Sequence, residues 1–374
     1  MGGEILLYAY GIICLSMIAF NLIYGLTIRG RDTRMERRSA RLQSAVEQQL
    51  RRLSKGHPVE MSHIRWLGRK LIHIRYLMAF DQTLDRLHQE DGPQPVRQYL
   101  MQIRGVILRL AVVYRGRESL QAAYFAYFLR RHKIAKYMPM EMIQNILVDY
   151  MKKDSLYCRV NALKALCAFG SWEHILQAVE IQDQGVGFLH EKILTECLLT
   201  YTGDVSRLIQ SFWEHLDEFS PRTKLGLLNY IRFQKGDYCS EMFEIMVDPK
   251  EDRELHFAAI RYFGRHQYPP AREKLLEFLE EDDAQNWEYA AISATALGSY
   301  EGEDVIDALA KALHSRNWYV RYNAAASLEA HHLSHGDLLK LVGRQDRYAR
   351  EMILYRMELS RMEQTWEKET VAAV

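Results

Sequence analysis

The sequence lacks most of the patterns that catalytic and metal-binding sites require. Its five cysteines form no CxxC pair, and no histidine stands at zinc-finger spacing from them. It has no GxxxxGKS or GxxxxGKT phosphate-binding loop, no GxGxxG and no GxSxG. It also has no strand signal past residue 95. These absences argue against a zinc finger, a nucleotide-phosphate cradle and a serine hydrolase, and they favour buried free thiols in an all-α protein.

The charge of the chain is nearly balanced overall but is distributed unevenly. The net charge is +1, which excludes the global basic character of a dedicated nucleic-acid binder. Residues 1–28 carry one acid and no lysine or arginine, whereas residues 29–75 carry thirteen basic against four acidic residues, a local charge of +9. The remainder is therefore at −7. This asymmetry marks residues 29–75 as a separate basic region.

The N-terminal segment is predicted to be a membrane anchor. Residues 5–28 contain no charged residue, and as a helix they would extend about 36 Å, enough to cross a bilayer. A signal peptide would show a basic start and a small-residue cleavage site, and a buried core helix would show a polar stripe. The arginines after the span place the N-terminus outside and the bulk of the chain in the cytoplasm, as a single-pass protein of the cell membrane.

The basic region, residues 29–95, is predicted to be helical and to lie beside the membrane. Leu42, Val46 and Leu50 form a narrow apolar stripe, and a second helix follows the break at residues 56–58. One interpretation is binding to anionic lipid headgroups; the alternatives are a solvated stalk and a nucleic-acid patch. The predicted membrane-surface residues are Arg29, Arg31, Arg34, Arg37, Arg38, Arg41, Trp66, Arg69 and Lys70.

Beyond residue 95 the chain repeats with a period of about 32 residues. Residues 317–328 align with residues 286–297 at an offset of 31, and further copies are predicted near 159, 191, 224, 256 and 350. Such a period predicts antiparallel helix pairs that stack into a solenoid, with Ala294, Ala324 and Ala325 at the contacts between repeats. Left-handed helix ends are expected at Gly170, Gly264 and Gly298.

The pattern Val320-Arg321-x-x-Ala324-Ala325-x-x-Leu328 resembles the bacterial HEAT-like repeat family over roughly residues 118–360. Copies near 191 and 224 depart from it, because Glu191-Lys192 and Lys224-Leu225 stand where Val-Arg is expected. The resemblance implies protein binding along a curved surface. One N-terminal span followed by such repeats also resembles bacterial proteins associated with membrane glycosyltransferases that make exopolysaccharides, so the resemblance implies a glycosyltransferase or polysaccharide synthase as partner.

The sequence argues against catalysis, but two alternatives to a scaffold that binds a membrane protein remain open. His331 and His335 are four residues apart, so a helix could bring both imidazoles to one face as zinc ligands. The segment with His331, His332 and His335 lacks the glutamate of a metalloprotease helix, however, and its histidines are interpreted as turn residues. Among HEAT-like enzymes, alkylpurine DNA glycosylases are disfavoured by the apolar segment and the charge of −7, and bilin lyases remain an alternative. A free membrane-tethered adaptor is another. No cofactor and no metal are predicted.

The sequence as a whole therefore predicts a non-catalytic, membrane-anchored scaffold. Its predicted parts are an anchor at residues 1–28, the basic region at 29–95 and an all-α solenoid of HEAT-like helix pairs at 96–374. Aromatic residues recur at the starts of the repeats and favour one binding edge. The predicted partner-binding residues, for the cytoplasmic part of a membrane protein complex, are Trp287, Trp318, Tyr319 and Arg321.

Overall fold

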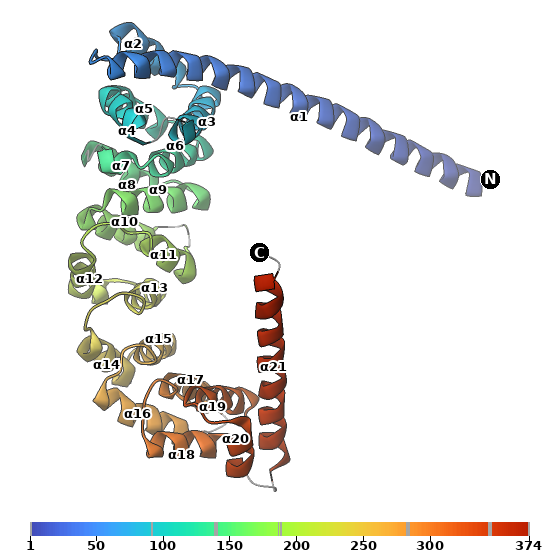
Figure 1. The fold of residues 1–374 in the computed structure, drawn as a ribbon, viewed down its shortest axis with the longest axis vertical. Helices are drawn as coiled ribbons and strands as arrows, with labels where there is room; N and C mark the ends of the chain where they lie inside the picture. Colours follow the sequence, from blue (N-terminus) through green and yellow to red (C-terminus); the bar gives the residue numbers. More distant parts are fainter. Residues whose placement is uncertain are drawn as a thin grey trace. The chain divides into compact units, whose positions relative to one another are not determined.

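The computed structural model describes residues 2–90, 93–137, 141–185, 187, 189–281, 285–342 and 346–372. Over these residues every element is a helix, a turn or a loop and there is no strand, which confirms the predicted all-α class. The chain divides into two compact units (Figure 1). Unit 1 comprises Met1–Leu189 and Thr200–Asp204, and unit 2 comprises His190–Leu199 and Val205–Val374. The predicted boundary after residue 95 thus lies inside unit 1.

The helices have the following bounds. Unit 1 contains α1 (Gly2–Ser54), α2 (Met61–Lys70), α3 (Ile74–Glu90), α4 (Pro93–Gln102), α5 (Arg104–Arg115), α6 (Ser119–Arg131), α7 (Ile134–Tyr137), α8 (Glu141–Tyr150), α9 (Leu156–Phe169) and α10 (Trp172–Gln184). Unit 2 contains α11 (Glu191–Leu198), α12 (Val205–Glu214), the 3-10 helix η1 (Leu216–Glu218), α13 (Pro221–Ile231), α14 (Cys239–Val247), α15 (Arg253–Phe263), α16 (Pro269–Glu280), α17 (Trp287–Leu297), α18 (Glu303–Ala312), α19 (Trp318–Ala330), α20 (His335–Val342) and α21 (Arg347–Ala372).

Unit 1 is built from two rows of stacked helices. In one row α3 contacts α6 and α6 contacts α9; in the other α2 contacts α5, α5 contacts α8 and α8 contacts α10. The C-terminal half of α1 packs on α3 and α4. Its predicted stripe of Leu42, Val46 and Leu50 is buried, so these residues belong to the core of the unit. Helix stacking therefore begins upstream of residue 118, where the repeat pattern first becomes readable.

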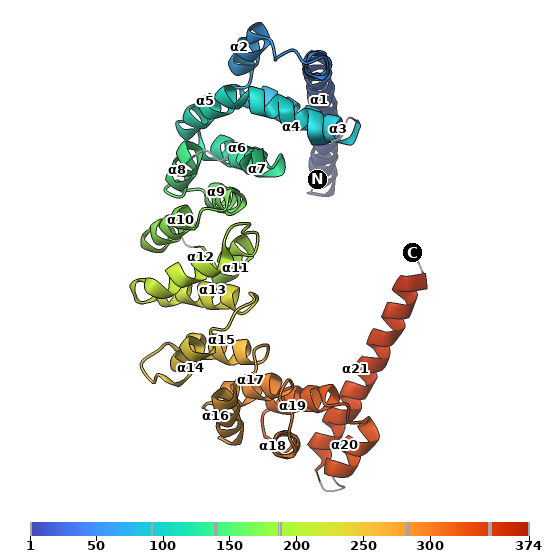
Figure 2. The same cartoon turned by 60° about the vertical axis from the view of Figure 1, so that its left-hand side comes forward.

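Unit 2 is also built from helix pairs, α11 to α21 (Figure 2). Its first-helix row runs α11, α13, α15, α17, α19 and α21, each in contact with the next. Predicted repeat positions 159, 224, 256, 290, 321 and 350 each fall on the fourth residue of a helix. Position 191 falls on the first residue of α11 instead, and the buried Leu194 is the fourth. The predicted register at that repeat was therefore three residues too early.

Small residues allow the first helices to approach closely, as predicted for Ala294, Ala324 and Ala325, which are fully buried. Polar side chains join neighbouring helices at the same places. The Ser327 hydroxyl donates to the Ala294 carbonyl at 2.7 Å, and the Asn323 amide donates to the Ala291 carbonyl at 2.7 Å. These bonds satisfy side chains that would otherwise be buried without partners.

The prediction of three left-handed helix ends was correct at one glycine and wrong at two. Gly170 has φ of 74° and ends α9 in the left-handed conformation. Gly264 and Gly298 are right-handed, with φ of −68° and −59°. A Cβ on Gly298 would lie 2.8 Å from Ser327 Oγ, and one on Gly264 would lie 3.3 Å from the Cα of Ala296. Both glycines are therefore needed for close helix contact, which local sequence does not distinguish from helix termination.

The N-terminal helix is longer than predicted. Instead of a span followed by a separate basic helix, α1 is one helix of 53 residues, about 80 Å at about 1.5 Å per residue. Among the described residues no helix is both long and apolar enough to span a bilayer, so the predicted transmembrane assignment of residues 5–28 is not supported. The described side chains between Tyr8 and Tyr24 are nevertheless apolar for the most part, and none of them is buried.

Candidate partner-binding surface

Five aromatic side chains of unit 2 form a continuous cluster, here called the aromatic ridge. It consists of Trp287 from α17, Trp318, Tyr319 and Tyr322 from α19, and Tyr355 from α21. The Trp287 and Tyr319 rings stack at 5.4 Å between centroids, and Trp318 and Tyr322 stack at 5.0 Å. Trp318 meets Tyr319 edge-on at 5.2 Å and Tyr355 at 6.2 Å. Three successive first helices therefore contribute to one aromatic surface.

Trp318 and Tyr319 are exposed because of where they stand in their helix, whereas Trp287 and Tyr322 are half-buried. Trp318 and Tyr319 are the first two residues of α19, and the side chain of the N-cap residue Asn317 accepts a hydrogen bond from the Tyr319 amide at 2.8 Å. These two side chains lie beside the helix end, whereas the next residue, Val320, is buried. Trp318 is 44% exposed and Tyr319 is 56% exposed. Large aromatic side chains that the core does not bury are the kind that dominate protein interfaces.

Arg356, which sequence reasoning missed, holds the ridge to α21. Its Nη1 donates to the Tyr322 hydroxyl at 3.0 Å and its guanidinium lies 5.1 Å from the centre of that ring. The same guanidinium is paired with both carboxylate oxygens of Glu329. Hydrogen bonding to Glu329 raises the pKa of Arg356. No sequence pattern predicts the pairing of Arg356 with Glu329, because the two residues lie 27 positions apart on different helices.

Arg321, predicted as part of the binding edge, has a structural task. Its Nη1 donates to the carbonyls of Ser315 and Arg316, in the turn before α19, at 2.7 and 3.2 Å. Its guanidinium also lies 5.6 Å from the centre of the exposed ring of Tyr348. Of the four predicted partner-binding residues, the structure brings Trp287, Trp318 and Tyr319 together, whereas the guanidinium of Arg321 is directed to the preceding turn.

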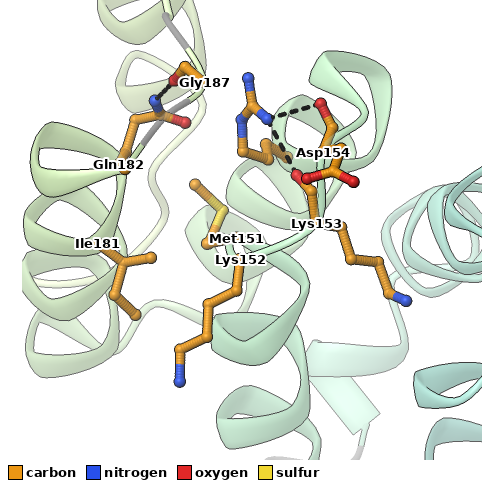
Figure 3. A pocket seen from close by; sticks show the side chains of 9 residues that line it. Met151, Lys152, Lys153, Asp154, Ile181, Gln182 and Gly187 are labelled. Carbon is orange, nitrogen blue, oxygen red and sulfur yellow. Dashed lines mark hydrogen bonds between the residues drawn. The ribbon is translucent and has the colours of Figure 1, made fainter.

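The same arginine position recurs in unit 1, where a cavity of about 400 Å³ lies between the turn before α9 and α10 (Figure 3). Arg159, the fourth residue of α9, donates to the carbonyls of Lys153 and Asp154 at 2.9 Å each. On the other side Gln182 donates to the carbonyl of Gly187. No nucleophile stands beside a base among the residues that line this cavity. We therefore infer that the repeated arginine stabilises the turn before its own helix by hydrogen bonds to the carbonyls of that turn.

An acidic cluster in unit 1 has the composition of a metal site, but the Arg131 guanidinium already pairs with its carboxylates. The side chains of Asp81, Asp85 and His132 offer oxygen and nitrogen atoms within 4.8 Å of one another. The Arg131 guanidinium pairs with both carboxylates, and His132 is hydrogen-bonded to Asp81 at 2.7 Å. The Tyr124 hydroxyl donates to Asp81 at 2.5 Å. Because Arg131 supplies the positive charge, the geometry favours a structural network over a metal centre.

The pKa of Asp81 shows the electrostatic balance of this network. Burial acts to raise the pKa of the carboxyl, but hydrogen bonds from His132 and Tyr124, together with the nearby Arg131 charge, outweigh it and hold the pKa below its ordinary value. The carboxylate is thus favoured in the folded protein. A charged Asp81 in a buried network is consistent with a role in fixing α3 against α6.

The predicted membrane-surface residues are spread over α1 and α2. Arg37, Arg41 and Arg69 are exposed. Trp66 is half-buried beside His63, with ring centroids 5.6 Å apart. Arg38 and Lys70 both approach the ring of Tyr76, at 5.6 and 5.2 Å. The side chains of Arg29, Arg31 and Arg34 lie outside those that the structure describes.

The sequence interprets His331, His332 and His335 as turn residues and not as metal ligands. The structure describes the surroundings of His331 and His332. His331 is hydrogen-bonded to the Leu297 carbonyl at 3.3 Å. His332 has φ of 62° and forms the turn after α19. The side chain of His335 lies outside those described.

Comparison with known proteins locates the repeat family in unit 2. Residues 240–329 match the family model of HEAT repeats. The matched segment runs from α14 into α19 and includes Trp287, Trp318, Tyr319 and Tyr322 of the ridge. No curated protein matches the sequence. A structure of human deoxyhypusine hydroxylase in complex with glycerol aligns with 79% of this chain and 95% of its own, at 19% identity and a TM-score of 0.26. A likeness this weak carries no argument about activity.

Proposed function

We propose that this chain is a non-catalytic scaffold that binds a protein partner through the aromatic ridge of unit 2. The observation that carries the proposal is one cluster of aromatic rings from three successive helices, two of them in the matched HEAT segment, in which Trp318, Tyr319 and Tyr355 are exposed. HEAT-type helix pairs supply a rigid row on which such side chains keep their positions. Preorganised aromatic rings lose little conformational freedom on binding, which favours affinity.

The partner that we propose is the cytoplasmic part of a membrane protein, with a glycosyltransferase or polysaccharide synthase as the class to seek first. A tether through the N-terminal part of α1 supports this choice. Residues 5–28 carry no charge, and the described side chains between Tyr8 and Tyr24 are exposed on every side of the helix. A helix that is apolar all round is unfavourable in water. Release of the chain from membranes by alkaline carbonate would contradict the tether.

The ridge can be tested with a closely matched control. Tyr157 is the second residue of α9 and is 55% exposed, as Tyr319 is the second residue of α19 and is 56% exposed. We would crosslink the wild-type chain, the double variant Trp318→Ala/Tyr319→Ala and Tyr157→Ala in cells, extract them in mild detergent and identify the crosslinked peptides by mass spectrometry.

The wild type and Tyr157→Ala are expected to retain one stoichiometric membrane protein crosslinked near the ridge. The double variant should bind it at least thirtyfold more weakly, roughly the loss of about 2 kcal/mol at an interface hot spot. Unchanged recovery with the folded double variant would refute the proposal. A visible absorbance band in the purified wild type would instead favour a bound pigment and the bilin-lyase alternative.

A further inference from the structure

A second pocket, in unit 1, brings together basic residues from three separate segments. Its volume is about 470 Å³. Arg38 comes from α1, Arg75 and Tyr76 from the start of α3, Arg117 from the turn before α6, and Gln121 from the first turn of α6. The turn between α2 and α3 completes the lining with Ile72 and His73. No carboxylate is among the residues that line the pocket.

The cations of this pocket are not neutralised by the protein. Among the described residues, none of Arg38, Arg75 and Arg117 lies within ion-pair distance of an acidic side chain. Lys70, 5.2 Å from the centre of the Tyr76 ring, has no acidic partner either. Some basic side chains elsewhere in unit 1 are paired, as Arg115 is with Asp149 at 2.8 Å. Neighbouring like charges repel one another, so this arrangement costs free energy unless an anion offsets it.

The backbone adds to the positive potential. α3 and α6 both begin at the pocket, and neither has an acidic residue in its first turn. Helix starts carry partial positive charge and unsatisfied amide groups, which attract anions. The N-cap residue of α6, Glu118, makes no side-chain capping bond and no ion pair with these cations. Two helix starts and three unpaired guanidinium groups therefore surround one cavity.

We propose that this pocket binds a phosphate-bearing anion through Arg38, Arg75 and Arg117. Guanidinium groups match phosphate oxygens with paired N–H donors, which suits them better than lysine to a bound phosphate group. The pocket volume exceeds that of a single phosphate and admits a group with two. The phosphate can belong to a lipid headgroup or to a soluble ligand. The site is independent of the aromatic ridge, which lies in unit 2.

The two sources can be separated with the full chain in nanodiscs. One set of discs contains phosphatidylcholine alone and the other contains phosphatidylcholine with phosphatidylglycerol. Inorganic pyrophosphate is titrated into the first set, with sodium chloride at matched ionic strength as the control. The readout is amide hydrogen exchange in the peptides that cover residues 72–76 and 117–121. If the chain does not enter discs, the pyrophosphate titration is made in solution, so failure of the tether and failure of the pocket remain distinct.

Protection by pyrophosphate indicates a soluble ligand, and protection by phosphatidylglycerol alone indicates a lipid headgroup; both support the proposal. Arg75→Gln and Arg117→Gln should each lower the affinity for the anion that gives protection about tenfold. Arg69→Gln, an exposed arginine outside the pocket, should leave it unchanged. Without anion, Arg75→Gln should also melt at or above the wild-type temperature because it removes repulsion. Absence of protection by either probe, or equal effects of all three variants, would overturn the proposal.

Discussion

Two stacked groups of aromatic residues in this chain lie in different environments. In unit 1, Phe80, Tyr114, Phe125 and Phe128 are fully buried, with the Tyr114 and Phe125 rings stacked at 5.1 Å and Phe80 6.0 Å from Phe128. In unit 2, the ridge residues stack at similar distances, but Trp318, Tyr319 and Tyr355 are exposed and Trp287 and Tyr322 are only half-buried. Ring stacking alone therefore does not tell a core from a surface.

The difference comes from position within the helix. Phe125 and Phe128 stand in the middle of α6, three residues apart, so they share the face that packs on neighbouring helices. Trp318 and Tyr319 stand at the first turn of α19, beyond the reach of the row. The fold needs the first pair for stability and does not need the second, which leaves the second available for a partner.

The largest effect is expected from Phe128→Ala. The ring centroid of Phe128 lies 5.0 Å from that of His132 and 6.3 Å from that of Phe125, and the Phe128 side chain is fully buried. Its removal leaves a cavity in a close-packed core and should lower the free energy of unfolding of unit 1 by about 3–5 kcal/mol. Urea unfolding followed by far-ultraviolet circular dichroism measures this change.

Trp318→Ala is the control for that measurement. Because its ring is half in solvent already, its removal should change the free energy of unfolding by less than about 1 kcal/mol. A loss as large as that of Phe128→Ala would show that the ridge is part of the core of unit 2, and the comparison between the two clusters would fail.

The repeat register shows what sequence alone can predict and where it stops. The alanine-rich contacts and six of seven repeat positions were readable, because each repeat places the same small residues at the same contact. The position near 191 was not, since α11 has Leu194 where the other helices carry a basic or small residue. The basic region predicted at 29–95 lies within unit 1, where α1 packs on α3 and α4 through contacts distant in sequence.

The next largest effect is expected from Gly298→Ala. An added Cβ would lie 2.8 Å from Ser327 Oγ and 3.1 Å from its Cβ, so α17 and α19 must separate slightly. We expect a loss of about 1–3 kcal/mol in the free energy of unfolding of unit 2. Since Trp287 stands on α17 and Tyr319 on α19, their stacked contact should loosen, which tryptophan fluorescence reports. Gly105→Ala, with no atom within 4 Å of the added Cβ, should be neutral or slightly stabilising.

The candidate sites were predicted less completely than the fold. Trp287, Trp318 and Tyr319 were identified because aromatic residues recurred at the helix starts. Arg356 and the residues Arg75 and Arg117 were missed because their role depends on what faces them across helices. A repeat pattern reports which residues share a position, and it carries no information on pairs formed between different positions.

The smallest effect concerns two carboxylates, Asp81 in the buried network of unit 1 and Asp304 on the surface of unit 2. The pKa of Asp81 is held low in the folded protein by its buried bonds to His132 and Tyr124. The folded state therefore binds fewer protons than the unfolded state in acid, and stability rises with pH. The contribution is complete above the ordinary aspartate pKa of about 3.9 and is lost as the pH falls through the lower folded value. For one group the slope cannot exceed about 1.4 kcal/mol per pH unit.

Asp81→Asn should remove this slope from urea unfolding of unit 1 between the two pKa values, even if it lowers stability at every pH. Asp304 is the matched surface case, because a hydrogen bond from Arg272 lowers the pKa of its exposed carboxyl. Salt screens exposed charges and leaves buried ones largely unaffected. Added sodium chloride should therefore abolish the effect of Asp304→Asn and preserve that of Asp81→Asn. Equal sensitivity to salt would mean that the Asp81 network is open to water, so the buried cluster would resemble the ridge more closely than its geometry indicates.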